Sequence, residues 1–282
     1  QSLADQLSAQ GRYAEAVQLF DSLRTQSEPG EVSRLSDQAR RGLTAQLIAR
    51  GENELRMGDP ALALRTFTDI SKDDATSVPA WRGRIAAESA LGMTWKESLK
   101  FDVPEDKDAL WWYRVGLAQS YAANKQGAAI ESLRRAISLD SSVFWYHQTL
   151  GFVLEQRGRQ QIDRDALIEA FESYENAIEL VPNDSGPDAL AALLQNAGNV
   201  ALELERNAEA RRLFARRDGL SAGFASALNE LLFRYQYGIA SFRAYETSEA
   251  ARQFTLALDL VRVAATRHAK DFPEERATAL RR

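Results

Sequence analysis

The chain has 282 residues, of which 45% are hydrophobic and 27% charged, with a formal net charge of −5. This composition is ordinary for a folded protein, and the acidic balance argues against a general affinity for nucleic acid. The chain contains no cysteine, which excludes a disulfide framework and a thiolate metal site.

A bulky residue flanked by small ones recurs along the chain, each time among apolar residues spaced i, i+3, i+4 and i+7. That spacing predicts a helix with one buried face, and a second such stretch precedes each anchor. The anchors, in chain order, are Phe20, Phe67, Leu133, Tyr174, Phe214 and Phe254. The last three lie forty residues apart. The sequence therefore predicts a helix pair that repeats.

The interval between Phe67 and Leu133 leaves room for one more, degenerate unit. Its two helices are expected near Trp81–Leu91 and Trp95–Phe101.

Small residues recur at fixed places in these helices. Successive first helices carry Gly151, Gly198 and Gly238. A glycine inside a helix costs about 0.8–1.0 kcal/mol relative to alanine, and close approach of a neighbouring helix can return that loss. Ala170 and Ala177 are expected to admit the neighbour, with Tyr174 filling the space between the helices. Pro182 is expected to end its helix because it has no backbone N–H to donate.

These motifs resemble the tetratricopeptide repeat, whose first helix reads W-x2-L-G-x2-Y and whose second reads A-x3-F-x2-A before a proline. LGFVLEQRG at 150–158 and AFESYENAIELVP at 170–182 match both halves, and the insertion RQQIDRD is expected to lengthen the turn between them. WYRVG at 112–116 and AIESLRRAISLD match again, with serine in the proline place. AGNVALELERNAEARRLF and YGIASFRAYETSEAARQF match without insertion.

The resemblance implies an all-α superhelix, a TPR-like solenoid of antiparallel helix pairs extending over residues 1–282. Seven units are expected, near 1–27, 31–75, 79–102, 108–141, 143–182, 187–218 and 224–270. Residues 271–282 read as the start of a further helix, with Pro273 in its first turn. The first unit has only a stub of its first helix, so we expect the natural protein to continue beyond this chain.

In the tetratricopeptide repeat family, particular positions in the first helix of each pair line the concave groove of the superhelix. Carried onto this sequence, those positions are Leu110, Tyr113, Leu117, Trp145, Gln148, Phe152, Gln195, Asn199, Leu232, Tyr235, Ile239 and Phe242. One interpretation places most of them in the core between repeats. The other makes them an aromatic and amide-lined trough for an extended peptide, a helix or a sugar chain.

Chaperone-type members of the family hold a partner's terminal carboxylate with a lysine–asparagine clamp. Asn199 occupies one matching place, but Gln195 stands where the lysine is expected. This departure argues against a receptor for chaperone tails.

Two features of the sequence could take part in chemistry, the GLSAG motif and the two histidines, and a structural role is favoured for both. GLSAG at 219–223 fits G-x-S-x-G, but that motif needs a strand before Ser221, and helical patterns flank it here. His147 and His268 lie in different units, and neither has a second ligand at i+4. No P-loop motif is present. We therefore predict no catalytic residue, no metal site, no cofactor and no enzymatic activity.

The leading hypothesis is a non-catalytic scaffold whose concave groove binds another protein or peptide, within a bacterial assembly for envelope export, secretion or polysaccharide biogenesis. Trp145, Phe152 and Tyr235 are expected to supply much of the affinity. A second hypothesis is a sensory or regulatory arm of a multidomain enzyme or transcription regulator. A third is a glycan-binding module. No apolar run long enough to cross a bilayer is present, and a periplasmic or envelope location is favoured over the cytoplasm.

Overall fold

The computed structural model describes residues 3–23, 29–99, 107–183, 185–220, 222–224 and 226–271. Every regular element in these ranges is a helix, and no strand occurs among them. The structure confirms the all-α fold of helix pairs that the repeat predicts. The chain divides into two compact units, Gln1–Ala136 and Ile137–Arg282.

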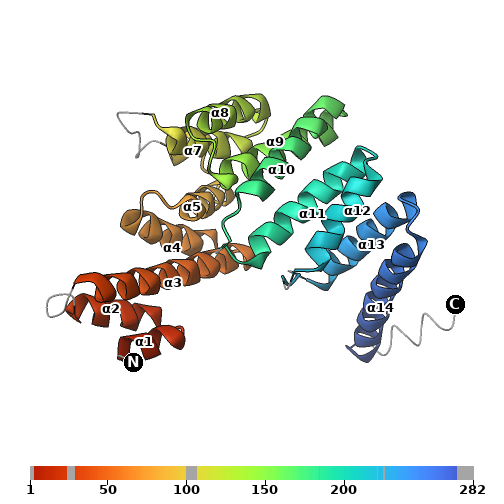
Figure 1. Ribbon diagram of the computed structural model, residues 1–282. Coiled ribbons are helices and arrows are strands. Elements are labelled where there is room, and N and C mark those ends of the chain that lie inside the picture. The colour runs from red at the N-terminus through yellow and green to blue at the C-terminus, as the bar shows by residue number, and fades with distance from the viewer. Residues whose placement is uncertain are drawn as a thin grey trace. The chain divides into compact units, whose positions relative to one another are not determined.

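In the first unit, successive helices from α1 to α5 pack against one another (Figure 1). Its helices are α1 (Leu3–Ala9), α2 (Tyr13–Leu23), α3 (Pro29–Arg56), α4 (Pro60–Asp73), α5 (Val78–Ala90), α6 (Trp95–Ser98), α7 (Ala109–Ser120) and most of α8 (Gln126–Leu139). The side chain of Asp59 caps α4 by accepting a hydrogen bond from the backbone N–H of Leu62, and Pro60 follows in the first helical position.

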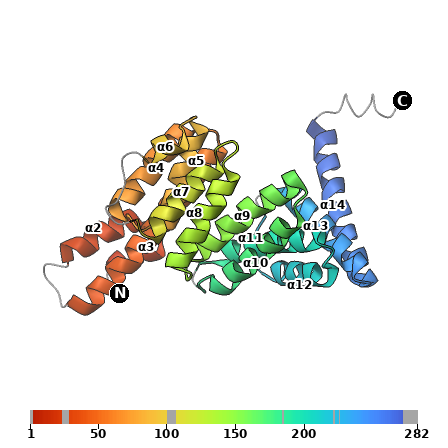
Figure 2. The ribbon, with the colours of Figure 1, turned by 90° about the horizontal axis from the view of Figure 1, so that it is seen from above.

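In the second unit, α9 packs on α10 and α11 on α12, side by side in both views (Figures 1 and 2). Its helices are α9 (Phe144–Gln161), α10 (Arg164–Leu180), α11 (Pro187–Glu203), α12 (Asn207–Asp218), α13 (Ala227–Arg243) and α14 (Thr247–Asp271). The carboxylate of Asp163 caps α10 and the hydroxyl of Ser226 caps α13. Polar caps satisfy backbone N–H groups that have no partner inside the helix.

The helices of a pair approach closely where a glycine of one faces the anchor of the other. A Cβ added to Gly198 would lie 2.5 Å from Cε1 of Phe214, and one added to Gly116 would lie 2.7 Å from Cγ of Leu133. A separation below about 3 Å does not fit packed carbon atoms, whose optimal spacing is about 3.5–4.0 Å. The glycines are therefore required by packing, as the sequence predicts.

One local prediction holds in part and another is wrong. The second helix of the degenerate unit, expected near Trp95–Phe101, begins at Trp95, but α6 ends at Ser98 and Leu99 lies in a turn, while residues 100 to 106 lie outside the described ranges. The insertion at 159–165 does not lengthen the turn, because α9 continues to Gln161 and α10 begins at Arg164.

The turn after α9 is compact because Ile162 adopts a left-handed conformation, with φ of 54°. Its backbone N–H bonds to the carbonyl of Gly158, which closes the helix, and the inserted residues add turns to the helices instead. Pro182 behaves as predicted: α10 ends at Leu180, and Val181 is extended, as a residue before proline prefers.

Candidate partner-binding surface

The predicted groove residues of the first compact unit, Gln1–Ala136, all lie on α7, and most of them are in the interior of that unit. Tyr113 is completely buried and Leu117 is 5% exposed, whereas Leu110 is half-buried. Tyr113 and Leu117 therefore have no surface to offer a partner. For these two positions the structure favours the interpretation as core.

On α9, the predicted residues differ in exposure. Trp145 is half-buried, and its ring lies 4.3 Å from that of the buried Phe144, centroid to centroid. Gln148 is half-buried, and its Oε1 is buried without a hydrogen-bond partner in the part of the chain that the structure describes. Phe152, one turn further along, is half exposed. Of the three, Phe152 has the most accessible apolar surface.

On α11, Gln195 and Asn199 are both half-buried. The Oδ1 atom of Asn199 is buried and accepts no hydrogen bond from any described residue. An unsatisfied buried acceptor costs about 1–3 kcal/mol.

On α13, the four predicted residues form a continuous apolar face. Leu232, Tyr235 and Phe242 are between 50% and 63% exposed, and Ile239 is half-buried. Residues three and four apart lie on the same side of a helix, so these positions align along α13. Leu228, which is exposed and lies one turn before Leu232, extends the face. Leu228 is not among the predicted groove residues, although its helical spacing places it in line with the other four.

The α13 face consists of Leu228, Leu232, Tyr235, Ile239 and Phe242.

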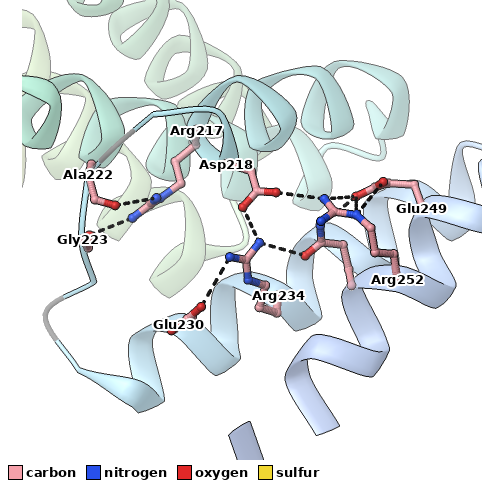
Figure 3. Close-up of polar contacts among 9 residues, drawn as sticks. Arg217, Asp218, Ala222, Gly223, Glu230, Arg234, Glu249 and Arg252 are labelled. Atoms are coloured by element: carbon pink, nitrogen blue, oxygen red, sulfur yellow. Dashed lines mark hydrogen bonds and ion pairs between the residues drawn. The ribbon is translucent and has the colours of Figure 1, made fainter. Parts of the chain in front are cut away.

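A network of charged side chains holds α13 between α12 and α14 (Figure 3). Asp218, the last residue of α12, accepts hydrogen bonds from Arg234 of α13 and from Nη2 of Arg252 of α14, the latter at 2.9 Å. Arg234 also donates to Oε1 of Gln253 at 3.2 Å. Arg252 and Gln253 in turn donate to Glu249, at 2.8 and 2.7 Å. One carboxylate thus joins three helices.

The network favours the ionised form of its acids. Burial alone would raise the pKa of Asp218, but hydrogen bonds from Arg252 and Arg234 outweigh burial and hold that pKa below its usual range. Burial opposes ionisation of Glu249 as well, and the bonds from Arg252 and Gln253 lower its pKa in the same way. Both carboxylates are therefore charged at neutral pH and contribute to the orientation of α13.

A second arginine fixes the connection from α12 to α13 (Figure 3). Arg217 is 4% exposed, and it donates to the carbonyls of Ala222 and Gly223 at 3.3 and 2.9 Å. Its guanidinium carbon lies 3.8 Å from the ring centroid of Phe224 and 5.0 Å from that of Phe233. Stacking on aromatic faces suits the planar guanidinium group. Backbone and ring contacts together position the N-terminus of α13.

The residues considered for catalysis or metal binding form no site among those described. Ser221 and the side chain of His268 lie outside the described residues. His147 is buried, and its Nε2 lies 3.0 Å from the carbonyl oxygen of Ser141, a structural contact. No group of three or more His, Cys, Asp or Glu side chains in the described ranges is arranged to hold a metal ion. Among the same residues, no helix is both long and apolar enough to cross a membrane.

No protein-family model and no curated protein matches the chain. Among solved structures, the MamA protein is 18% identical over 79% of this chain and 94% of its own, with a TM-score of 0.40. A chain of the APC/C Cut9–Hcn1 hetero-tetramer is 17% identical over 93% of this chain and 54% of its own, with a TM-score of 0.48. A tetratricopeptide repeat protein from Parabacteroides merdae is 15% identical over 91% and 90%, with a TM-score of 0.42. The similarity is distant.

Proposed function

We propose that this chain is a non-catalytic scaffold that binds a partner protein or peptide through the α13 face. The observation that supports it most is the contrast with α11, forty residues earlier. The five positions of α11 that correspond to the α13 face are Asp188, Ala192, Gln195, Asn199 and Leu202. Four of these are polar or small, whereas every residue of the α13 face is large and apolar. The repeat pattern alone does not require this change.

The exposure of the α13 face supports a role in binding. Tyr235 and Phe242 are 53% and 63% exposed, and a row of large apolar groups in water is unfavourable unless another molecule covers it. Aromatic side chains of this kind supply most of the affinity at protein interfaces. A partner that presents an apolar face at helical spacing would cover the row. We propose Phe152 on α9 and the amides of α11 as further contacts within the same unit.

The proposal is tested by placing a photo-crosslinking amino acid at Phe242 in the producing organism and identifying the protein captured there. The affinity of the purified partner is then measured for the full chain and for Tyr235→Ala/Phe242→Ala. Loss of two anchors should weaken binding at least about thirtyfold, since each hot-spot residue contributes about 1–2 kcal/mol or more.

The matched control is Met57→Ala/Leu139→Ala, which removes two exposed apolar side chains elsewhere. It should leave the affinity unchanged. Far-UV circular dichroism establishes that both variants keep their helices. Equal affinities of all three proteins, or capture from Met57 but not from Phe242, would refute the site. Trp145→Ala and Phe152→Ala then show whether α9 belongs to the same surface.

A further inference from the structure

Among the helices in the described ranges, α6 is the shortest. α6 has 4 residues, whereas the second helices of the other pairs, α2, α4, α8, α10, α12 and α14, have between 11 and 25. Thr94 starts α6 with a capping box to Glu97, and Leu99 lies buried just after its end. A cleft of about 430 Å³ lies among α5, α6 and the turn after α7.

The walls of this cleft are largely apolar and aromatic. They include Ile85 of α5, Met93 before α6, Trp95 of α6 and Tyr121 after α7. Trp95 is half-buried and Tyr121 is half exposed, so both rings have surface left for a ligand. The phenol of Tyr121 is protonated at neutral pH, as tyrosine ordinarily is, and its pKa is raised further by the buried part of the side chain despite the nearby charge of Arg82, so it can donate a hydrogen bond.

The ionised side chains among the described lining residues are both cationic, Lys96 and Lys125. The ammonium of Lys96 lies 5.7 Å from the ring centroid of Trp95, which places the charge beside the aromatic wall. Glu97, the acid of α6, accepts bonds of 2.7 Å from both the backbone N–H and the hydroxyl of Thr94. The cleft therefore combines apolar rings with positive charge.

We propose that this cleft binds a small aromatic carboxylate. Its ring would lie against Trp95 and Tyr121, and its carboxylate would be attracted by the ammonium groups of Lys96 and Lys125. The volume is within the range of about 300–1,000 Å³ that is typical of small-molecule sites. The site lies in the first unit and does not depend on the partner surface of α13.

The test uses the full chain labelled with fluorotryptophan, and fluorine NMR as the readout. The probe is indoleacetate, and its neutral counterpart is indoleacetamide, which has the same ring without the charge. The chain has five tryptophans, and Trp95→Phe assigns the resonance of Trp95. We expect indoleacetate to shift that resonance saturably, with a Kd below about 1 mM, and indoleacetamide to bind about tenfold more weakly.

The variant Lys96→Ala/Lys125→Ala should weaken indoleacetate binding about tenfold, the combined effect of two partly exposed charge pairs, and leave indoleacetamide binding unchanged. Lys72→Ala, which removes an exposed lysine of α4 from its pair with Asp69, is the control for loss of a surface lysine outside the cleft and should change neither affinity.

Three results would overturn the proposal. They are a Trp95 resonance that does not move at the highest soluble concentration of indoleacetate, equal affinity for the two probes, and parallel shifts of all five tryptophan resonances.

Discussion

The α9–α10 and α13–α14 pairs follow one pattern but differ in how well their anchors are buried. Tyr174 of α10 and Phe254 of α14 occupy the same place in the repeat, and each faces a glycine, Gly151 and Gly238 respectively. Tyr174 is completely buried, whereas Phe254 is 37% exposed. The repeat motif determines where an anchor points. The residues packed beyond the pair determine how much of the anchor is covered.

The two pairs also differ in their polar contacts. The hydroxyl of Tyr174 donates to Oε2 of Glu155 at 2.6 Å, and Arg159 pairs with the same carboxylate at 2.7 Å. Burial raises the pKa of Glu155 despite the opposing effects of Tyr174 and Arg159. In the α13–α14 region the pKa of Asp218 is lowered instead. At Glu155 burial therefore outweighs the polar contacts of the carboxylate, whereas at Asp218 the hydrogen bonds outweigh burial.

The largest expected effect is the difference between the two anchors in how much stability is lost when each is replaced by alanine. Tyr174→Ala should lower the free energy of unfolding by about 3–5 kcal/mol, because it leaves a cavity and deprives Glu155 of a hydrogen bond. Phe254→Ala should cost about 1–2 kcal/mol, because part of that ring is already in water. Urea unfolding followed by circular dichroism measures both values. Equal losses would contradict the difference in burial.

Two matched glycine substitutions should differ in stability for the same reason, the burial of the facing anchor, but by a smaller amount. A Cβ added to Gly198 or to Gly238 would lie 2.5 Å from Cε1 of the facing ring, Phe214 or Phe254. Phe214 is completely buried and cannot move aside, so Gly198→Ala should destabilise the protein by about 1–3 kcal/mol.

Phe254 has room to shift toward solvent, so Gly238→Ala should change stability by less than about 1 kcal/mol, helped by the higher helix propensity of alanine. Thermal unfolding of the two variants makes the comparison. If Gly238→Ala proves the more damaging, the ring of Phe254 is held more firmly than its exposure indicates.

The pH dependence of the stability of α13 and α14 provides a third test of the comparison. Asp218 and Glu249 have lowered pKa values in the fold, so they stabilise it above their unfolded pKa values, about 4, and lose that contribution as the pH falls further. We expect a loss of about 1–2 kcal/mol, reduced by solvent because Arg252 is half exposed. Hydrogen exchange in α13 measures it.

Asp218→Asn should remove most of this dependence, while Asp259→Asn, which breaks an exposed pair with Arg262, serves as the control and should not. Glu155 acts in the opposite direction: its raised pKa makes the charged form unfavourable, so acid relieves that cost in α9 and α10. These opposite directions would be contradicted if lowering the pH increased hydrogen exchange more in α9 than in α13.

The sequence by itself determined the helix pairs. Three features of the sequence predict these pairs: the helical spacing of the apolar residues, the spacing of the glycines, and Pro182. Each acts through local sterics or through one neighbouring helix, and such short-range effects can be inferred from a single sequence. The sequence did not predict that α6 would end at Ser98 or that the insertion after Gly158 would extend the helices. Both outcomes depend on the backbone conformation of the residues that end each helix.

Only the tertiary structure separated buried from exposed residues among equivalent positions. Tyr113 and Tyr235 occupy corresponding places in the repeat, yet the first is buried and the second exposed. The network around Asp218 likewise joins side chains from three helices, and no local pattern marks it. Burial and charge pairing depend on atoms distant in sequence, which is why the exposure of the α13 face required the packed molecule, although the repeat pattern predicts four of its five residues.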